Sequence, residues 1–196
     1  MQLLEVINKA FLAVSILSVS MGCALADTKC NSANLTNPDI IICSQAAFTK
    51  VDKVLNEQYK ALSSELDPSL KPELLSAQKS WIKLKEGYCK EDGDGAAESP
   101  IDSLSCTKQF TSFRLNELVY LRTGVIGDGF YKAVSVVNEK ATAMNYPKAV
   151  EFVGGDVDFG TSWKEYAGKN CAMTQKLYGE TAERCLARMR FQMPIF

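Results

Sequence analysis

Histidine is absent from the 196 residues of this chain. Because histidine is the usual general base in enzymes and the commonest metal ligand, its absence removes Ser-His and Cys-His nucleophile pairs. The cysteines form no Cys-x-x-Cys pair either, so thiolate metal sites are not expected. The sequence therefore predicts a protein that is not an enzyme, with no catalytic residues, no metal site and no cofactor.

An excess of charge of one sign is also missing. Lysine and arginine number 22 and the acidic residues 23, which leaves a formal net charge of −1. Proteins that bind nucleic acid usually carry a strongly basic surface, so nucleic acid is not an expected partner. Hydrophobic residues make up 46% of the chain, which is enough to form a packed core.

Long apolar runs are scarce, and the clearest one lies near the start, at residues 10–22. It is too short to span a bilayer comfortably, and the small residues Ala24 and Ala26 follow it. This order is typical of an export signal, so we expect residues 1–26 to be a signal peptide cleaved before Asp27. The mature protein would be periplasmic or secreted, with no stable transmembrane segment after processing.

A lipoprotein signal is the alternative interpretation of the same region. The segment "SMGC" would then end at a lipidated Cys23, which would anchor the protein in the membrane. Gly22 suits such a site, but Ser20 stands where leucine is usual. The cut before Asp27 is therefore our expectation.

Seven cysteines are present, and either processing route removes Cys23 from the pool of free thiols. Six remain, an even number in an oxidising compartment, which predicts three disulfides. These six are Cys30, Cys43, Cys89, Cys106, Cys171 and Cys185.

Apolar residues recur at spacings of three and four along most of the chain, which predicts amphipathic helices. We expect helices over residues 38–66, 72–88, 104–122, 163–173 and 181–193, and a loop over residues 152–162. A helix over residues 130–144 is less well supported, because its cluster of valines disfavours helix formation. No pair of alternating strands is evident, so the predicted fold class is all-α.

One spacing occurs twice: tryptophan, seven residues, cysteine. It runs from Trp81 to Cys89 and again from Trp163 to Cys171, each time after a serine. In each case a loop leads to a second cysteine at the start of another helix, and basic residues follow: Arg114 in one, Arg188 and Arg190 in the other.

We interpret this repeat as two related helical hairpins, each closed by its own disulfide. That predicts the pairs Cys89–Cys106 and Cys171–Cys185, and leaves Cys30–Cys43 by elimination. The corresponding domains would be residues 27–124 and a shortened second helical unit, residues 125–196.

Residues 30–121 resemble the lysozyme-inhibitor LprI family. The resemblance rests on Ile42-Cys43, "VDKVLNEQYKAL" at residues 51–62, "AQKSWIKLKEGYC" at residues 77–89, and Cys106, Arg114 and Leu118. It implies a small, exported, helical, disulfide-bonded protein, in a family named for members that block lysozyme. Lys85 departs from the family's usual arginine, which keeps the charge but loses bidentate pairing. The region after Gly124 is not the usual family domain.

Several polar and aromatic residues of these motifs have structural explanations. Asp52 and Asn56 lie one helical turn apart, and we expect them to form a hydrogen bond that locks two helices together. We expect the same role for Gln78. Trp81 and Trp163 are expected to anchor the core rather than to form a ligand platform.

The segment "EDGDGAAESPID" is the candidate binding surface. It places Glu91, Asp92, Asp94, Glu98 and Asp102 between Cys89 and Cys106, with no basic residue among them. An EF-hand is excluded because Ser103 stands where the closing glutamate would be. The segment is either a solvated loop or an anionic surface for a basic protein.

Three functions are compatible with these features. The chain could be a periplasmic binding protein that inhibits lysozyme or a related cell-wall hydrolase, which is our preferred hypothesis. It could be an immunity protein against a secreted envelope toxin, or a structural envelope module with no inhibitory activity. The expected partner of an inhibitor is a basic, envelope-degrading protein, because the candidate surface is acidic.

Overall fold

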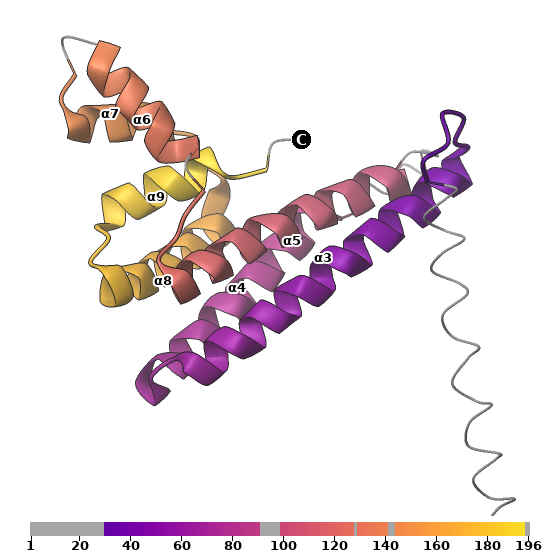
Figure 1. Ribbon diagram of the computed structural model, residues 1–196, viewed down its shortest axis with the longest axis horizontal. Coiled ribbons are helices and arrows are strands. Elements are labelled where there is room, and N and C mark those ends of the chain that lie inside the picture. Colours follow the sequence, from indigo (N-terminus) through magenta and orange to yellow (C-terminus); the bar gives the residue numbers. More distant parts are fainter. Residues whose placement is uncertain (1–29, 91–98, 128, 141–143, 195–196) are drawn as a thin grey trace, which may run out of the picture.

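The structure is a computed structural model that describes residues 30–90, 99–127, 129–140 and 144–194. Every regular element in these ranges is a helix, and no strand occurs among them. The all-α class predicted from the sequence is therefore confirmed. The elements, labelled as in Figure 1, are α3 (Asn37–Glu65), the 3₁₀ turn η1 (Pro68–Leu70), α4 (Lys71–Tyr88), α5 (Ser99–Thr123), α6 (Gly129–Lys140), α7 (Tyr146–Gly154), α8 (Gly160–Tyr178) and α9 (Ala182–Phe191).

Short polar signals set the ends of the first helices. The Asp39 carboxylate accepts hydrogen bonds from both the backbone N–H and the hydroxyl of Thr36, which fixes the start of α3. Asp67 caps η1 by accepting from the Ser69 N–H at 2.8 Å. Pro72 lies in the first turn of α4, where proline costs no hydrogen bond.

Several segments differ from the sequence-based expectation. Helix α5 begins at Ser99 rather than Leu104, so Asp102 belongs to its first turn. The expected loop over residues 152–162 shrinks to residues 155–159, because α7 continues to Gly154 and α8 begins at Gly160. Helix α6 forms despite its valines, since Val134 is completely buried and packing outweighs propensity.

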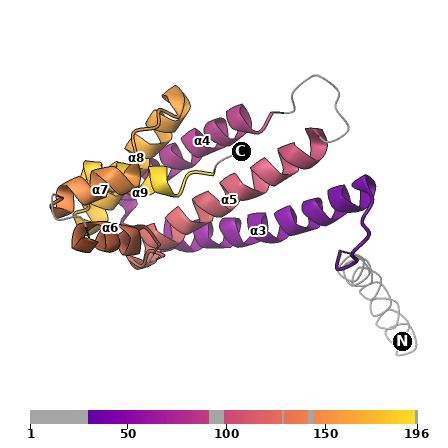
Figure 2. The same cartoon turned by 90° about the horizontal axis from the view of Figure 1, so that it is seen from above.

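The long helices pack in pairs (Figures 1 and 2). Helices α3 and α5 lie side by side and run in the same direction. Their C-terminal parts are joined by Arg122 of α5, which donates hydrogen bonds to Gln58 and Glu65 of α3. Helix α4 lies antiparallel to α8. A Lys176–Glu73 ion pair joins them at one end, and the Tyr88 hydroxyl donates to the Phe159 carbonyl at the other.

One large apolar core is shared by α3, α4, α5, α8 and α9, and a smaller one lies between α6, α7 and α9. Gly154 permits the close approach of α7 to α9: a Cβ there would lie 2.4 Å from the Cβ of Ala187. The core thus continues from the first half of the chain into the second.

The three disulfides are the expected pairs, Cys30–Cys43, Cys89–Cys106 and Cys171–Cys185. The two Trp-Cys motifs are not structurally equivalent, however. Helix α4 ends beside Cys89, as expected, whereas α8 continues beyond Cys171 to Tyr178. A common origin of the two units therefore stays a prediction.

Candidate functional site

One end of the molecule carries two of the disulfides, and we call it the stapled end. It consists of the first turns of α3 and α5 and the last turn of α4 (Figure 2). Cys89 caps the C-terminus of α4 and is bonded to Cys106, inside α5. The Ser103 hydroxyl also donates to the Cys89 carbonyl at 2.8 Å. The end of α4 is therefore fixed to α5 by a covalent and a hydrogen bond.

Of the acidic residues proposed as a binding surface, the structure describes one. Asp102 is exposed in the first turn of α5, where a carboxylate interacts favourably with the helix dipole. The other four, Glu91, Asp92, Asp94 and Glu98, lie outside the described residues. The acidic surface is thus neither confirmed nor contradicted.

A shallow hollow of about 500 Å³ lies beside the Cys89–Cys106 bond. Lys85, Glu86, Lys90 and Thr107 line it together with Cys89. The Lys85 ammonium lies 4.8 Å from the centre of the Trp81 ring, a cation–π contact that a lysine supports without bidentate geometry. No group of metal-ligating side chains occurs here or elsewhere in the described part of the chain.

The apolar stripe of α3 that faces the core becomes less buried toward the stapled end. Leu62 and Leu55 are 2% and 1% exposed, and the residues seven and fourteen positions before Leu55, Phe48 and Ile41, are only half-buried. Ile101 and Leu104 in the first turns of α5 are half-buried as well. Apolar surface therefore remains accessible where the acidic segment is attached.

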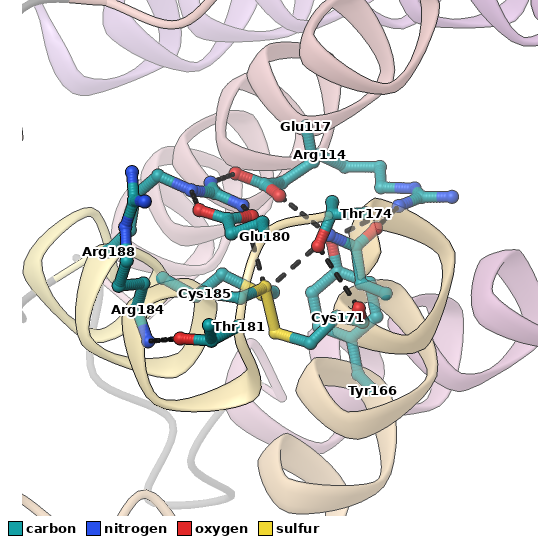
Figure 3. The surroundings of a disulfide bond; sticks show 12 residues. Arg114, Glu117, Tyr166, Cys171, Thr174, Glu180, Thr181, Arg184, Cys185 and Arg188 are labelled. Atoms are coloured by element: carbon teal, nitrogen blue, oxygen red, sulfur yellow. Dashed lines mark hydrogen bonds and ion pairs between the residues drawn. A yellow bond between two sulfur atoms is a disulfide. The ribbon is translucent and has the colours of Figure 1, made fainter. Parts of the chain in front are cut away.

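A network of buried charges joins the first half of the chain to the second (Figure 3). The Arg188 guanidinium donates to the carboxylates of Glu117 and Glu180, and all three side chains are at most 2% exposed. The Asn170 amide donates to Glu117 at 2.6 Å. Burial alone would lower the pKa of Arg188, but the two carboxylates raise it, so the guanidinium stays charged.

Arg114 extends this network into the first half. Its guanidinium donates to Gln78 at 2.9 Å, to Asn170 at 2.8 Å and to the Tyr166 hydroxyl at 3.3 Å. Burial raises the pKa of Tyr166 to about 12, so this hydroxyl stays neutral. Figure 3 shows Arg114 and Glu117 from α5, Tyr166 from α8 and Arg188 from α9 around the same disulfide. Because the charged members of this network are buried, it holds the helices together inside the protein and forms no part of the surface.

The structural roles assigned from the sequence are mostly confirmed. Trp81 and Trp163 are 3% and 2% exposed in the core. Gln78 links α4 to α5 through Arg114. The lock between helices expected from Asp52 and Asn56 was wrong: Asn56 donates to the Asp52 carboxylate at 2.9 Å within α3. Residues one turn apart satisfy each other locally when both are near solvent.

The buried carboxylates are the residues that sequence reasoning missed. Arg114 and Arg188 were visible as basic residues that follow a cysteine, but Glu117 and Glu180 had no motif to distinguish them. Glu117 and Arg188 are 71 residues apart in the chain, so only the packing of α9 on α5 brings them together.

Three disulfides in a small all-helical fold are typical of an extracytoplasmic, covalently stabilised protein. Residues 28–118 match the family model "Lysozyme inhibitor LprI", the family that the sequence motifs resemble. The match ends inside α5, so α6 to α9 lie beyond it. No curated protein and no solved structure matches the chain. None of the described helices is long and apolar enough to cross a membrane.

Proposed function

We propose that the mature chain is an exported inhibitor of lysozyme or of a related cell-wall hydrolase. The observation that carries this proposal is the match of residues 28–118 to a family of lysozyme inhibitors. The chain also has no histidine, the usual general base of enzymes. A protein of this kind acts by binding rather than by catalysis.

The charge distribution favours a basic partner. Residues 86–102 contain six carboxylates and one lysine, a formal charge of −5 in a chain whose total is only −1. An acidic region of this kind attracts a basic enzyme over about one Debye length, roughly 8 Å at physiological salt. The Cys89–Cys106 bond limits the freedom of the connecting segment, which lowers the entropy lost when it binds.

Inhibition of a commercial lysozyme by the purified, oxidised mature protein tests the proposal. We expect a stoichiometric loss of lytic activity on cell-wall substrate, with serum albumin at equal concentration as the control. Full lysozyme activity in the presence of excess protein would contradict inhibition of lysozyme itself. A pull-down from envelope extract then separates a related hydrolase from a toxin bound by an immunity protein, and absence of any stoichiometric basic partner would contradict both.

A further inference from the structure

We propose that the hydrolase binds this protein while α8 and α9 stay closed over α4 and α5, so that the body of α5 (residues 103–121) offers it no surface. The inference rests on the proposed function and adds the form in which the partner is bound. Helices α8 and α9 lie beyond the region that matches the family model, and we call them the lid (Figure 1). The contacts beneath the lid show whether it can open for a partner.

The first argument is the apolar surface that the lid covers. Tyr166 of α8 packs edge-on against Phe113 of α5, with ring centres 6.0 Å apart, and the two residues are 0% and 3% exposed. Trp163 and Met173 of α8 are buried in the same core. Exposing one large apolar side chain to water lowers the population of an open form by about tenfold or more. Opening exposes at least Tyr166 and Phe113, so fewer than about 1% of the molecules would be open.

The second argument is the set of polar contacts across the lid. Arg114 of α5 donates to Tyr166 and Asn170 of α8. Glu117 of α5 accepts from Asn170 and from Arg188 of α9. Arg114 and Glu117 are completely buried, so both depend on the lid for these partners. Because the geometry of hydrogen bonds is narrow, these contacts hold the lid in one position.

The third argument is that contacts with the lid follow α4 from its first turn to its last. Glu73 pairs with Lys176 in the first turn of α4. The Ser80 hydroxyl donates to Glu165 at 3.1 Å in the middle. The Tyr88 hydroxyl donates to the segment just before α8 at 2.8 Å in the last turn. The lid therefore opens only if contacts at both ends and in the middle break together.

A closed lid leaves the body of α5 almost without accessible surface. Of residues 103–121, all of which the structure describes, Asn116 alone is exposed. A partner that required the open form would bind more weakly in proportion to the open fraction, which is at least about a hundredfold here. A tight inhibitor is therefore bound in the closed form, through residues outside the body of α5.

The experiment fixes the lid with a chemical cross-link. Lys83 of α4 and Glu165 of α8 form an ion pair, and their side chains are 69% and 38% exposed. In the full mature protein, Lys83→Cys is combined with Glu165→Cys, and a short bis-maleimide joins the two thiols. The matched control is the same variant with each thiol capped by N-ethylmaleimide. Mass measurement verifies both products, which are then titrated against a commercial lysozyme.

We expect the cross-linked protein to inhibit within about twofold of the capped control, because binding does not need the lid to open. A cross-linked protein that inhibits at least about tenfold more weakly than its control would overturn the inference and leave the proposed function intact. If capping alone abolishes inhibition, the cross-link is moved to Glu73 and Lys176, at the other end of the two helices, and the same comparison decides.

Native-state hydrogen exchange of the wild-type protein tests the closed lid without any hydrolase. We expect the buried amides of α8 and of α5 to have protection factors within about tenfold of each other, because the two helices unfold together. Exchange in α8 at least about a hundredfold faster than in α5 would show that the lid opens by itself, and would overturn the inference. A wild-type protein that neither binds nor inhibits lysozyme would instead overturn the proposed function, and the inference with it.

Discussion

The Arg188 guanidinium lies wholly inside the protein, between two carboxylates and 4.6 Å from the centre of the Tyr120 ring. Removing one member of a buried ion pair leaves the other charged and unpaired in the interior. We therefore predict that Arg188→Met lowers the free energy of unfolding by about 3–5 kcal/mol, measured by urea denaturation.

Arg122→Met is the matched control for this prediction. Arg122 also pairs with a glutamate, Glu65 at 2.7 Å, but both side chains are accessible to solvent. Surface pairs contribute little, so the control should lose no more than about 1 kcal/mol. Equal losses in the two variants would show that burial does not set the energy of the Arg188 network.

Glu165 makes folding stability sensitive to acid. Hydrogen bonds from Lys169 and Ser80, together with the charge of Lys169, lower the pKa of this carboxyl from 4.5 to about 2. Because the folded-state pKa is the lower one, the stabilisation is complete above pH 4.5 and is lost as the pH falls toward about 2.

We predict that Glu165→Gln flattens the decline of stability across this pH range. Urea midpoints at several pH values would measure the slope, with Glu151→Gln, an exposed carboxyl on α7, as the control. A slope identical to that of wild type would contradict the role of Glu165.

At the scale of elements, the acidic segment between α4 and α5 determines the association rate if the proposed function is right. We predict that changing Glu91, Asp92 and Asp94 to Gln, Asn and Asn slows association with the hydrolase and reduces its dependence on salt. The sequence predicts that these carboxylates are solvated, and a solvated carboxylate contributes within about 0.5 kcal/mol to stability, so dissociation and thermal stability should change little.

A charge-matched control for the acidic segment changes Glu139, Asp156 and Glu183 to Gln, Asn and Gln. These residues are exposed in the second half of the chain, and the change in net charge is the same. Kinetics at low and high salt would separate local steering from a general charge effect. A wild-type association rate in the segment variant would mean that the segment is only solvated surface.

The disulfides should differ in their contribution to stability. Cys89→Ser with Cys106→Ser opens a loop whose ends are 17 residues apart, which predicts a loss of about 3 kcal/mol from chain entropy. The corresponding change at Cys171 and Cys185 should cost more, because these residues are 4% and 0% exposed and serine would bury two hydroxyls. Urea denaturation of both variants tests this order, and the reverse order would contradict it.

At the scale of the whole molecule, export is the condition for both the disulfides and the proposed partner. We predict that the protein recovered from periplasm begins at Asp27, because small residues at Ala24 and Ala26 follow the apolar run of residues 10–22. Intact-mass measurement under non-reducing conditions would give the start of the chain and the number of disulfides together. A diacylated species that begins at Cys23 would instead establish the lipoprotein route.

Local patterns were sufficient for most of the helices and for the three disulfides. The three-and-four spacing of apolar residues marks α3, α4 and most of α5, because it reflects the single face that each helix buries. The repeated Trp-Cys spacing selected the disulfide pairs. Prediction failed at Asp102, where α5 begins earlier than expected, and at α7, for which no helix was expected. Tertiary contacts stabilise helical turns whose local propensity is weak.

The sequence by itself determined the all-helical class, the cysteine pairing, the absence of histidine chemistry and the concentration of acidic residues between two cysteines. Only the tertiary structure decided that Glu117 and Arg188 meet in the core, and that no residue of α3 before Leu55 is buried. The physical reason is the separation in sequence between the residues that determine each feature. Helix periodicity and the closure of short disulfide loops depend on residues close in sequence. Burial of a charge pair or exposure of an apolar stripe depends instead on which distant helix lies across it.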